Sequence, residues 1–163
     1  MIECIEFARL APSAANLQPL EFVLVTKDIE FVFKNVVFSG YVKEGAPTDE
    51  EQAQAYIIVL SNQEINKDSK YDVGLAISNI ILIAESKNIA TCILGSIKRK
   101  QIRNHFQIPE KFNIDLIVAL GKAAQKSYEE KLEEDIKYWL DDEGNIHVPK
   151  KNLKNILHEE TFK

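Results

Sequence analysis

The amino-acid sequence predicts a single α/β domain in which helices cover a parallel sheet. Runs rich in β-branched residues at 21–26, 55–60 and 113–120 alternate with segments of helical periodicity, an order typical of that fold class. With 163 residues, 45% of them hydrophobic, the chain can bury one sizeable core. The net charge of −5 gives no broad basic face, so we expect no nucleic acid and no membrane as a partner.

In the first half of the chain, apolar spacing predicts two helices and two strands. Ile2, Ile5 and Ala8 recur at helical spacing before Pro12, which ends the first helix. In chain order we expect a helix over residues 2–11, a strand at 21–26, an amphipathic helix at 29–37, a turn with capping-box spacing at 48–51 and a buried strand at 55–60.

The second half begins with the most apolar helix, at 71–87. Val73, Ala76, Ile77 and Ile80 form its main stripe, and further Leu and Ile residues extend the stripe nearly around the helix. We therefore expect this helix to be central and largely buried. A strand at 89–94, a basic helix at 98–106 and a strand at 113–120 follow. Because the chain is acidic overall, we expect the basic side chains of the helix at 98–106 to be solvated.

Charged residues dominate the sequence beyond Gly121, and too few apolar residues remain there to form a core. The single tryptophan, Trp139, lies in this tail, which indicates that the tail packs on another surface. A partner subunit is the surface that we expect. The sequence thus predicts one domain, with a compact body at 1–121 and a C-terminal arm at 122–163 that packs on the partner.

Cysteine and histidine spacings predict neither a redox pair nor a metal site. Cys4 and Cys92 form no Cys-x-x-Cys unit, and the three histidines show no metal-ligand spacing. The first residues lack the build of a secretory signal, and no apolar run approaches the roughly 18 residues that span a bilayer. We expect reduced thiols, no bound metal and a cytoplasmic protein.

Three blocks of the sequence resemble the FMN-dependent nitroreductases, and they occur in that family's order. The first is Ala-Pro-Ser-Ala-Ala-Asn-Leu-Gln-Pro at 11–19. The second is Tyr-Asp-Val-Gly-Leu-Ala-Ile-Ser-Asn at 71–79, which leads through its helix to Ala-Thr-Cys-Ile-Leu-Gly at 90–95. The third is His-Val-Pro-Lys-Lys at 147–151. The resemblance depends on the occurrence of all three blocks in one chain.

This resemblance implies a different fold from the one that periodicity alone predicts. Nitroreductases have an α+β fold, with a mixed, largely antiparallel central sheet flanked by helices. Their two subunits form an intertwined homodimer by exchanging C-terminal segments, and FMN lies at the interface. A buried helix at 71–87 and a tail without its own core both suit such a dimer.

The resemblance also implies a cofactor site. Turn residues would offer backbone groups, a hydroxyl and an amide to the polar edge of the flavin ring, and small residues would let the backbone approach it. Two late lysines would neutralise the phosphate. The implied cofactor-binding residues are Pro12, Ser13, Ala14, Asn16, Leu94, Gly95, Lys150 and Lys151. No catalytic acid or base is assigned, because the flavin supplies the chemistry.

Enzymes of this kind usually take hydride from NADH or NADPH onto FMN and pass electrons to a nitroaromatic, a quinone or a similar small acceptor. The family's usual Arg-Arg-Ser-x-Arg segment, which grips the phosphate, does not precede the 11–19 block, so we expect weakened FMN binding. The alternative function is a non-catalytic relative that serves as a binding or interaction module. Residues 39–50 are a candidate substrate loop.

Each site assignment has a purely structural alternative. Residues 12–16 contain turn formers and could make an ordinary turn. Gly95 could simply end a strand. Lys150 and Lys151 could begin a surface helix at 152–157.

Overall fold

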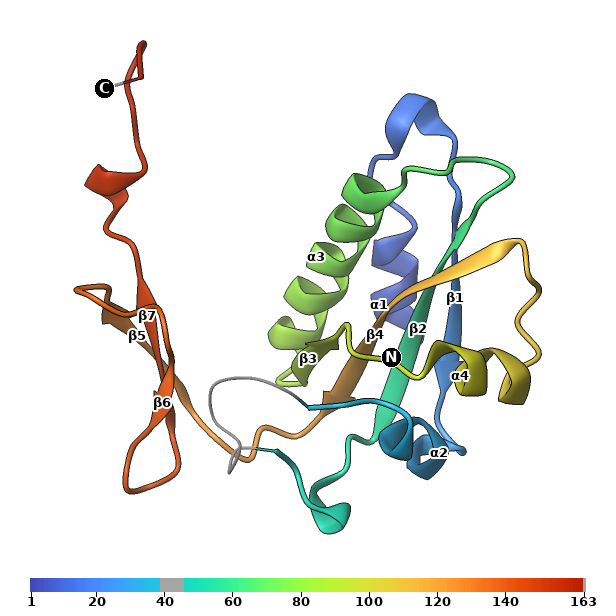
Figure 1. Cartoon of the computed structure of the whole chain (residues 1–163), viewed down its shortest axis with the longest axis horizontal. Helices are drawn as coiled ribbons and strands as arrows, with labels where there is room; N and C mark the ends of the chain where they lie inside the picture. Colours follow the sequence, from blue (N-terminus) through green and yellow to red (C-terminus); the bar gives the residue numbers. More distant parts are fainter. Residues whose placement is uncertain (39–45, 163) are drawn as a thin grey trace. The chain divides into compact units, whose positions relative to one another are not determined.

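A computed structural model of the chain describes residues 1–38 and 46–162 (Figure 1). The chain divides into two compact units, and each is described by itself. Of the described residues, the first unit contains 1–38 and 48–123, and the second contains 46–47 and 124–162. Most of the candidate substrate loop at 39–50 lies outside the described residues.

The first unit contains the helices and strands that the sequence predicts, with shifts of a few residues at their ends. In chain order they are α1 (Ile2–Ala8), the 3-10 turn η1 (Ala14–Asn16), β1 (Leu20–Val25), α2 (Ile29–Lys34), the 3-10 turn η3 (Asp49–Glu51), β2 (Ala55–Asn62), α3 (Lys70–Ser86), β3 (Ala90–Leu94), α4 (Arg99–His105) and β4 (Phe112–Gly121). The expected capping box opens η3, where Thr48 and Glu51 bond reciprocally.

The four strands form one sheet in the order β1-β2-β4-β3, and every neighbouring pair is antiparallel. The parallel sheet that the alternation of elements predicts is therefore wrong, and the largely antiparallel α+β fold is confirmed. A strand that is buried on both faces has the same apolar run in either kind of sheet, so composition could not separate the two folds.

The centre of the unit is β2, whose eight residues are all buried. Tyr56 and Ile58 pack with α2 and α4 on one face of the sheet. Ile57 and Val59 pack with α1 and α3 on the other face. Helices thus cover both faces (Figure 1), and side chains that alternate along β2 supply both hydrophobic clusters.

One side of α3 departs from the prediction of a largely buried helix. Its inner side is buried against the sheet and α1, but Tyr71, Leu75 and Leu82 are 83%, 46% and 65% exposed. Gly74 is also exposed, and a Cβ added there would meet nothing within 4 Å. The chain therefore leaves an apolar stripe of this helix uncovered.

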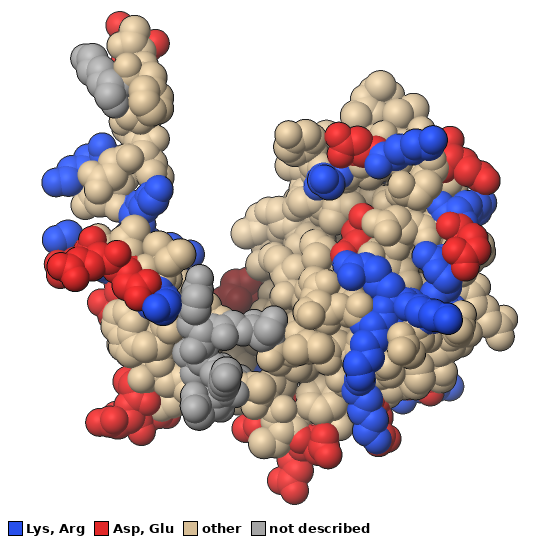
Figure 2. Space-filling view, in the orientation of Figure 1, with Lys and Arg blue, Asp and Glu red and all other residues tan. Residues whose placement is uncertain are grey.

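The side chains of the basic helix α4 are exposed as expected at Lys98, Arg99 and Lys100, whereas Arg103 is half-buried, and both arginines also bind backbone carbonyls. Arg103 donates to the carbonyls of Ile108, Pro109 and Phe112 at 3.2, 2.7 and 2.7 Å. Arg99 donates to the carbonyls of Ile114, Asp115 and Gly95. Figure 2 shows Lys and Arg side chains on the side of the unit that carries α2 and α4. Arg99 and Arg103 therefore tie α4 to the backbone around β4.

The second unit is a small sheet that the sequence did not predict. Its strands are β5 (Ser127–Lys131), β6 (Trp139–Leu140) and β7 (Ile146–Lys150), with β7 in the middle, parallel to β5 and antiparallel to β6. None of the residues 124–162 is buried, as expected for a tail that lacks its own core. The alternative of a surface helix at 152–157 is wrong, because only the short 3-10 turn η4 (Leu153–Asn155) forms there.

Polar and aromatic contacts around His147 hold this small sheet together. Its Nδ1 lies 2.7 Å from Glu130 Oε1 and its Nε2 lies 3.2 Å from Asp141 Oδ2. Hydrogen bonds to these two carboxylates raise the pKa of His147, Glu130 having the larger effect. The Trp139 ring stacks on the imidazole at 5.4 Å. Ionic and ring contacts thus replace a hydrophobic core in this unit.

No helix within residues 1–38 and 46–162 combines the length and the apolar character that crossing a bilayer would require.

The three carbonyl bonds of Arg103 predict a measurable contribution to stability. Arg103→Ala leaves carbonyls of the segment before β4 without their donor, so we expect the free energy of unfolding to fall by about 1–3 kcal/mol. Chemical denaturation followed by circular dichroism measures this change. Lys100→Ala on the same helix is the control, and an equal effect of the two substitutions would contradict the assigned role of Arg103.

Candidate functional site

Residues 12–18, here called the 12–18 loop, form a tight and strained turn between α1 and β1. Ala15, Asn16 and Gln18 have φ values of 49°, 55° and 50°, in the left-handed region that non-glycine residues avoid. This backbone costs roughly 1–2 kcal/mol per residue, less for Asn. Single residues of this kind occur elsewhere in the chain, at Asn88, Gln107 and Glu160, but the 12–18 loop contains three of them, and this concentration of strain favours a functional reason for the shape of the loop.

Hydrogen bonds inside the loop fix this conformation. The Asn16 amide donates to the Ser13 carbonyl at 2.9 Å, and the Leu17 amide donates to the Ala14 carbonyl at 3.0 Å. The Ser13 hydroxyl accepts from the Gln18 amide at 3.0 Å. The loop is therefore shaped before any ligand arrives.

A side chain from α3 ties the loop to the body of the unit, and sequence reasoning missed it. Asp72 Oδ1 accepts a hydrogen bond of 3.0 Å from the Ala14 amide. Asp72 is buried on the inner side of α3. The sequence did contain a sign of this role, because Asp72 is an acidic residue at an inner position of a strongly apolar helix.

The outer surface of the loop remains open. Pro12, Ala14, Ala15 and Asn16 are exposed, and Ser13 is half-buried. Small and polar side chains on a rigid, exposed turn can contact the edge of a planar ligand through backbone groups, a hydroxyl and an amide.

Leu94 and Gly95, here called the β3 end, form the second candidate segment. Leu94 is buried and Gly95 is exposed. A Cβ added at Gly95 would lie 3.5 Å from Leu116 Cδ2, which is an ordinary contact. Packing within the chain therefore does not require glycine here, which leaves the close approach of a ligand as a reason for it.

Arg99 holds the β3 end in place. Its Nη2 donates to the Gly95 carbonyl at 3.3 Å and to the Asp115 carbonyl at 3.1 Å, and its Nε donates to the Ile114 carbonyl at 2.8 Å. The Ile114 and Asp115 carbonyls lie where β4 departs from regular pairing with β2. Arg99 is the second supporting residue that sequence reasoning missed.

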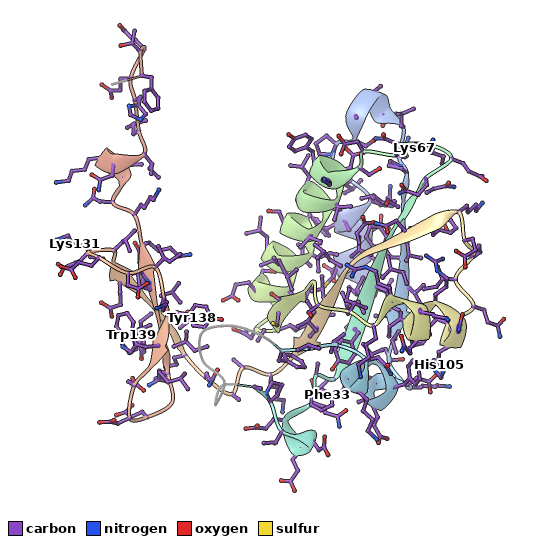
Figure 3. The ribbon with its side chains drawn as sticks, viewed as in Figure 1. Phe33, Lys67, His105, Lys131, Tyr138 and Trp139 are labelled. Carbon is purple, nitrogen blue, oxygen red and sulfur yellow. The ribbon has the colours of Figure 1, made fainter. Side chains whose placement is uncertain are left out.

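Lys150 and Lys151 lie in the second unit, at the end of β7. Lys150 is directly opposite Lys131 in the parallel β5–β7 pair, and Figure 3 shows the Lys131 side chain at the end of β5. An open hollow there is lined by Glu129, Glu130, Lys131, Lys150, Lys151, Asn152 and Leu153. Lys131, which the sequence pattern did not single out, thus adds a third cation near the two expected ones.

Two titratable groups on the strands of the first unit, Tyr56 in β2 and Cys92 in β3, have raised pKa values. Burial raises the pKa of Tyr56 to about 12, and its hydroxyl has no hydrogen-bond partner. Desolvation likewise raises the pKa of the Cys92 thiol, so the thiol stays protonated. Among the described residues, no group of three His, Cys, Asp or Glu side chains is arranged to hold a metal ion.

Comparison with known proteins identifies the family. The model described as "Nitroreductase family" matches residues 1–122, about three quarters of the chain. The chain belongs to the nitroreductase family. A relative from Bacillus subtilis (strain 168), named "Putative NAD(P)H nitroreductase YodC", is 23% identical over 162 residues, covering 79% of this chain and 80% of its own.

Solved structures show the same nitroreductase fold. An FMN-dependent nitroreductase from Clostridium difficile R20291 has a TM-score of 0.67 at 20% identity and covers 99% of this chain and 86% of its own. A protein from Desulfovibrio desulfuricans, described as a "putative nitroreductase in complex with FMN", has a TM-score of 0.69 at 19% identity, with coverages of 98% and 83%.

Within one chain, the 12–18 loop and the β3 end do not come together. The loop precedes β1 and the β3 end follows β3, and these two strands are the opposite edges of the sheet. In the register of the sheet, Leu94 is aligned with Val23, which lies three strands away. The backbone of Leu94 therefore lies about 17 Å from Leu20, and the loop lies beyond Leu20. In Figure 1 the loop is at the first turn of α3, whereas β3 begins near its last turn.

The open surroundings of Gly95 predict that the fold tolerates a larger residue there. Because the φ of Gly95 is ordinary and a methyl group fits, Gly95→Ala should leave the free energy of unfolding unchanged or raise it by about 0.4–1 kcal/mol. Thermal and chemical denaturation measure this directly. A loss of stability would show that the glycine serves packing within the chain, against the ligand-approach interpretation.

Proposed function

We propose that this protein is an FMN-dependent oxidoreductase that passes electrons from NADH or NADPH to a nitroaromatic, a quinone or a similar small acceptor. The observation that carries the proposal is the strained, pre-shaped and exposed 12–18 loop in a member of the nitroreductase family. Residues Pro12, Ser13, Ala14 and Asn16 would contact the polar edge of the flavin ring. When bound, FMN supplies the hydride chemistry.

Two solved structures support the choice of cofactor. The structure from C. difficile R20291 is named FMN-dependent, and the one from D. desulfuricans is described as a complex with FMN. Both share the fold of this chain at low identity, so the support is for a common cofactor and not for a common acceptor.

We propose further that the flavin site is complete only in a homodimer. The 12–18 loop and the β3 end belong to opposite edges of one sheet, so the loop of one copy would face Leu94 and Gly95 of another. The exposed stripe of α3 would be the surface that a second copy covers. Gly74 lies on that stripe and has open space around it, which would permit close helix contact. A mid-helix glycine otherwise costs about 1 kcal/mol relative to alanine.

The phosphate of FMN would be held by Lys150 and Lys151, joined by Lys131. These side chains line one hollow, and Lys131 and Lys150 are paired in register. Among the described residues, the Lys131 side chain is otherwise engaged only by a surface ion pair with Glu133 at 3.4 Å, a kind of contact that contributes little. Three ammonium groups can neutralise a dianionic phosphate, whereas the glutamates at the hollow make the site weaker.

The proposal predicts saturable FMN binding that depends on the lysines. Purified protein should quench the fluorescence of added FMN. Lys150→Ala with Lys151→Ala should weaken binding by roughly 10- to 100-fold for each lysine that holds the phosphate. Lys137→Ala, an exposed lysine of the same unit, is the control.

Three outcomes of this titration separate the possibilities. Binding that weakens only in the double variant supports the phosphate site. Binding that does not change removes Lys150 and Lys151 from the site. If the wild-type chain does not quench FMN fluorescence, the enzyme proposal is contradicted. The alternative function, a non-catalytic binding module with the family's fold, would then be favoured.

The homodimer predicts that disturbing α3 abolishes assembly and cofactor binding together. Leu82→Glu places a charge on the exposed stripe, where it would be buried against a partner. We expect the variant to elute as a folded monomer in size-exclusion chromatography with light scattering, and FMN affinity to fall at least about tenfold. Lys67→Glu in an exposed loop (Figure 3) is the control. A Leu82→Glu dimer with normal FMN binding would contradict this interface.

A further inference from the structure

We infer that Asp72 is a positioning residue for the flavin-contacting surface of the 12–18 loop. The inference rests on the proposed function and adds to it a residue that would not itself contact the cofactor. Asp72 acts through the Ala14 amide, to which it is hydrogen-bonded across 58 positions of sequence.

The setting of Asp72 is unusual for a residue with a merely local role. Asp72 is 4% exposed and belongs to the buried side of α3, which otherwise consists of the apolar residues Val73, Ala76, Ile77, Ile80 and Ala84. One oxygen accepts from Ala14, and the other, Oδ2, is buried without a hydrogen-bond partner. A buried, half-satisfied carboxylate is costly. The hydrogen bond from the Ala14 amide offsets part of that cost.

The position of Asp72 in α3 explains how the charge is tolerated. It is the third residue of the helix, after Lys70 and Tyr71. Unpaired amides of a first turn carry a partial positive charge that favours an acidic side chain there. The helix terminus stabilises the carboxylate, and the carboxylate in turn holds the loop.

The strain of the loop explains why such an anchor is needed. Ala15, Asn16 and Gln18 would relax toward negative φ if the loop were free. The bonds among Ser13, Asn16 and Gln18 are local and would move with the loop. The bond from Ala14 to Asp72 instead fixes the first residue of η1 to a rigid helix. A charge-assisted acceptor suits this task because its bonds are about twice as strong as neutral ones.

Two substitutions of Asp72 separate anchoring from general stability. Asp72→Ala removes the acceptor, whereas Asp72→Asn keeps an oxygen that can accept from Ala14. Val73→Ala is the matched control, because Val73 is the adjacent buried residue and truncating it leaves a cavity without touching the loop. Ala14→Pro removes the donor from the other side. The residue before it is extended, with φ −129° and ψ 155°, as proline requires.

The first readout needs no cofactor. Hydrogen exchange of the Asn16, Leu17 and Gln18 amides, measured by NMR, should accelerate at least about tenfold in Asp72→Ala and Ala14→Pro relative to wild type. Exchange should stay near wild type in Asp72→Asn and Val73→Ala. If Asp72→Ala does not fold, Ala14→Pro tests the same bond.

The second readout is FMN affinity by fluorescence quenching. Asp72→Ala should raise the dissociation constant roughly 10- to 100-fold, and Asp72→Asn should restore it to within a few-fold of wild type. Val73→Ala should lower the melting temperature but keep the affinity. Unchanged loop exchange in Asp72→Ala and Ala14→Pro would overturn the inference. Accelerated exchange with no FMN binding by the wild type would instead uphold the anchor and contradict the proposed function.

Discussion

The burial of β2 on both faces is the constraint on which the rest of the first unit depends. Its eight buried residues send alternate side chains to two sets of helices, so the unit needs α1 and α3 on one face and α2 and α4 on the other. With β2 and β4 in the middle, β1 and β3 are left as the edges. That order separates the 12–18 loop from the β3 end, and it is the physical reason for proposing a site shared by two copies.

Much of this fold could be predicted from periodicity, because the helices and strands of the first unit have strong apolar patterns. The direction of strand pairing could not be predicted from periodicity. The helices α2 and α3 lie between successive strands, as in a parallel fold, and only the register of β1 with β2 and of β3 with β4 shows that the pairing is antiparallel. The second unit also escaped prediction, because its sheet relies on contacts of His147 with Glu130 and Asp141, which carry no periodic signal.

The candidate site likewise has a part that could be predicted from the sequence and a part that could not. Resemblance to a family indicated the residues that would contact a ligand, such as Ser13 and Gly95. It did not indicate the residues that support them. Arg99 belongs to a basic run typical of a solvated helix, and its three carbonyl bonds depend on where β4 passes α4. Asp72 and Lys131 were likewise hidden, because their partners lie 58 positions away in sequence or on another strand.

The central claim, that the loop of one copy and the β3 end of another form one site, is tested most directly with mixed dimers. Ala14→Leu should block the loop and Gly95→Val the β3 end, and both positions are exposed in the chain. The two variants, carrying different affinity tags, are co-expressed, and the doubly tagged dimer is isolated. One of its two sites then combines an intact loop with an intact β3 end. We expect one FMN per mixed dimer, bound with the affinity of a wild-type site, and little in either parent dimer. A mixed dimer as empty as its parents would contradict it, since a site within one chain would be damaged in both copies.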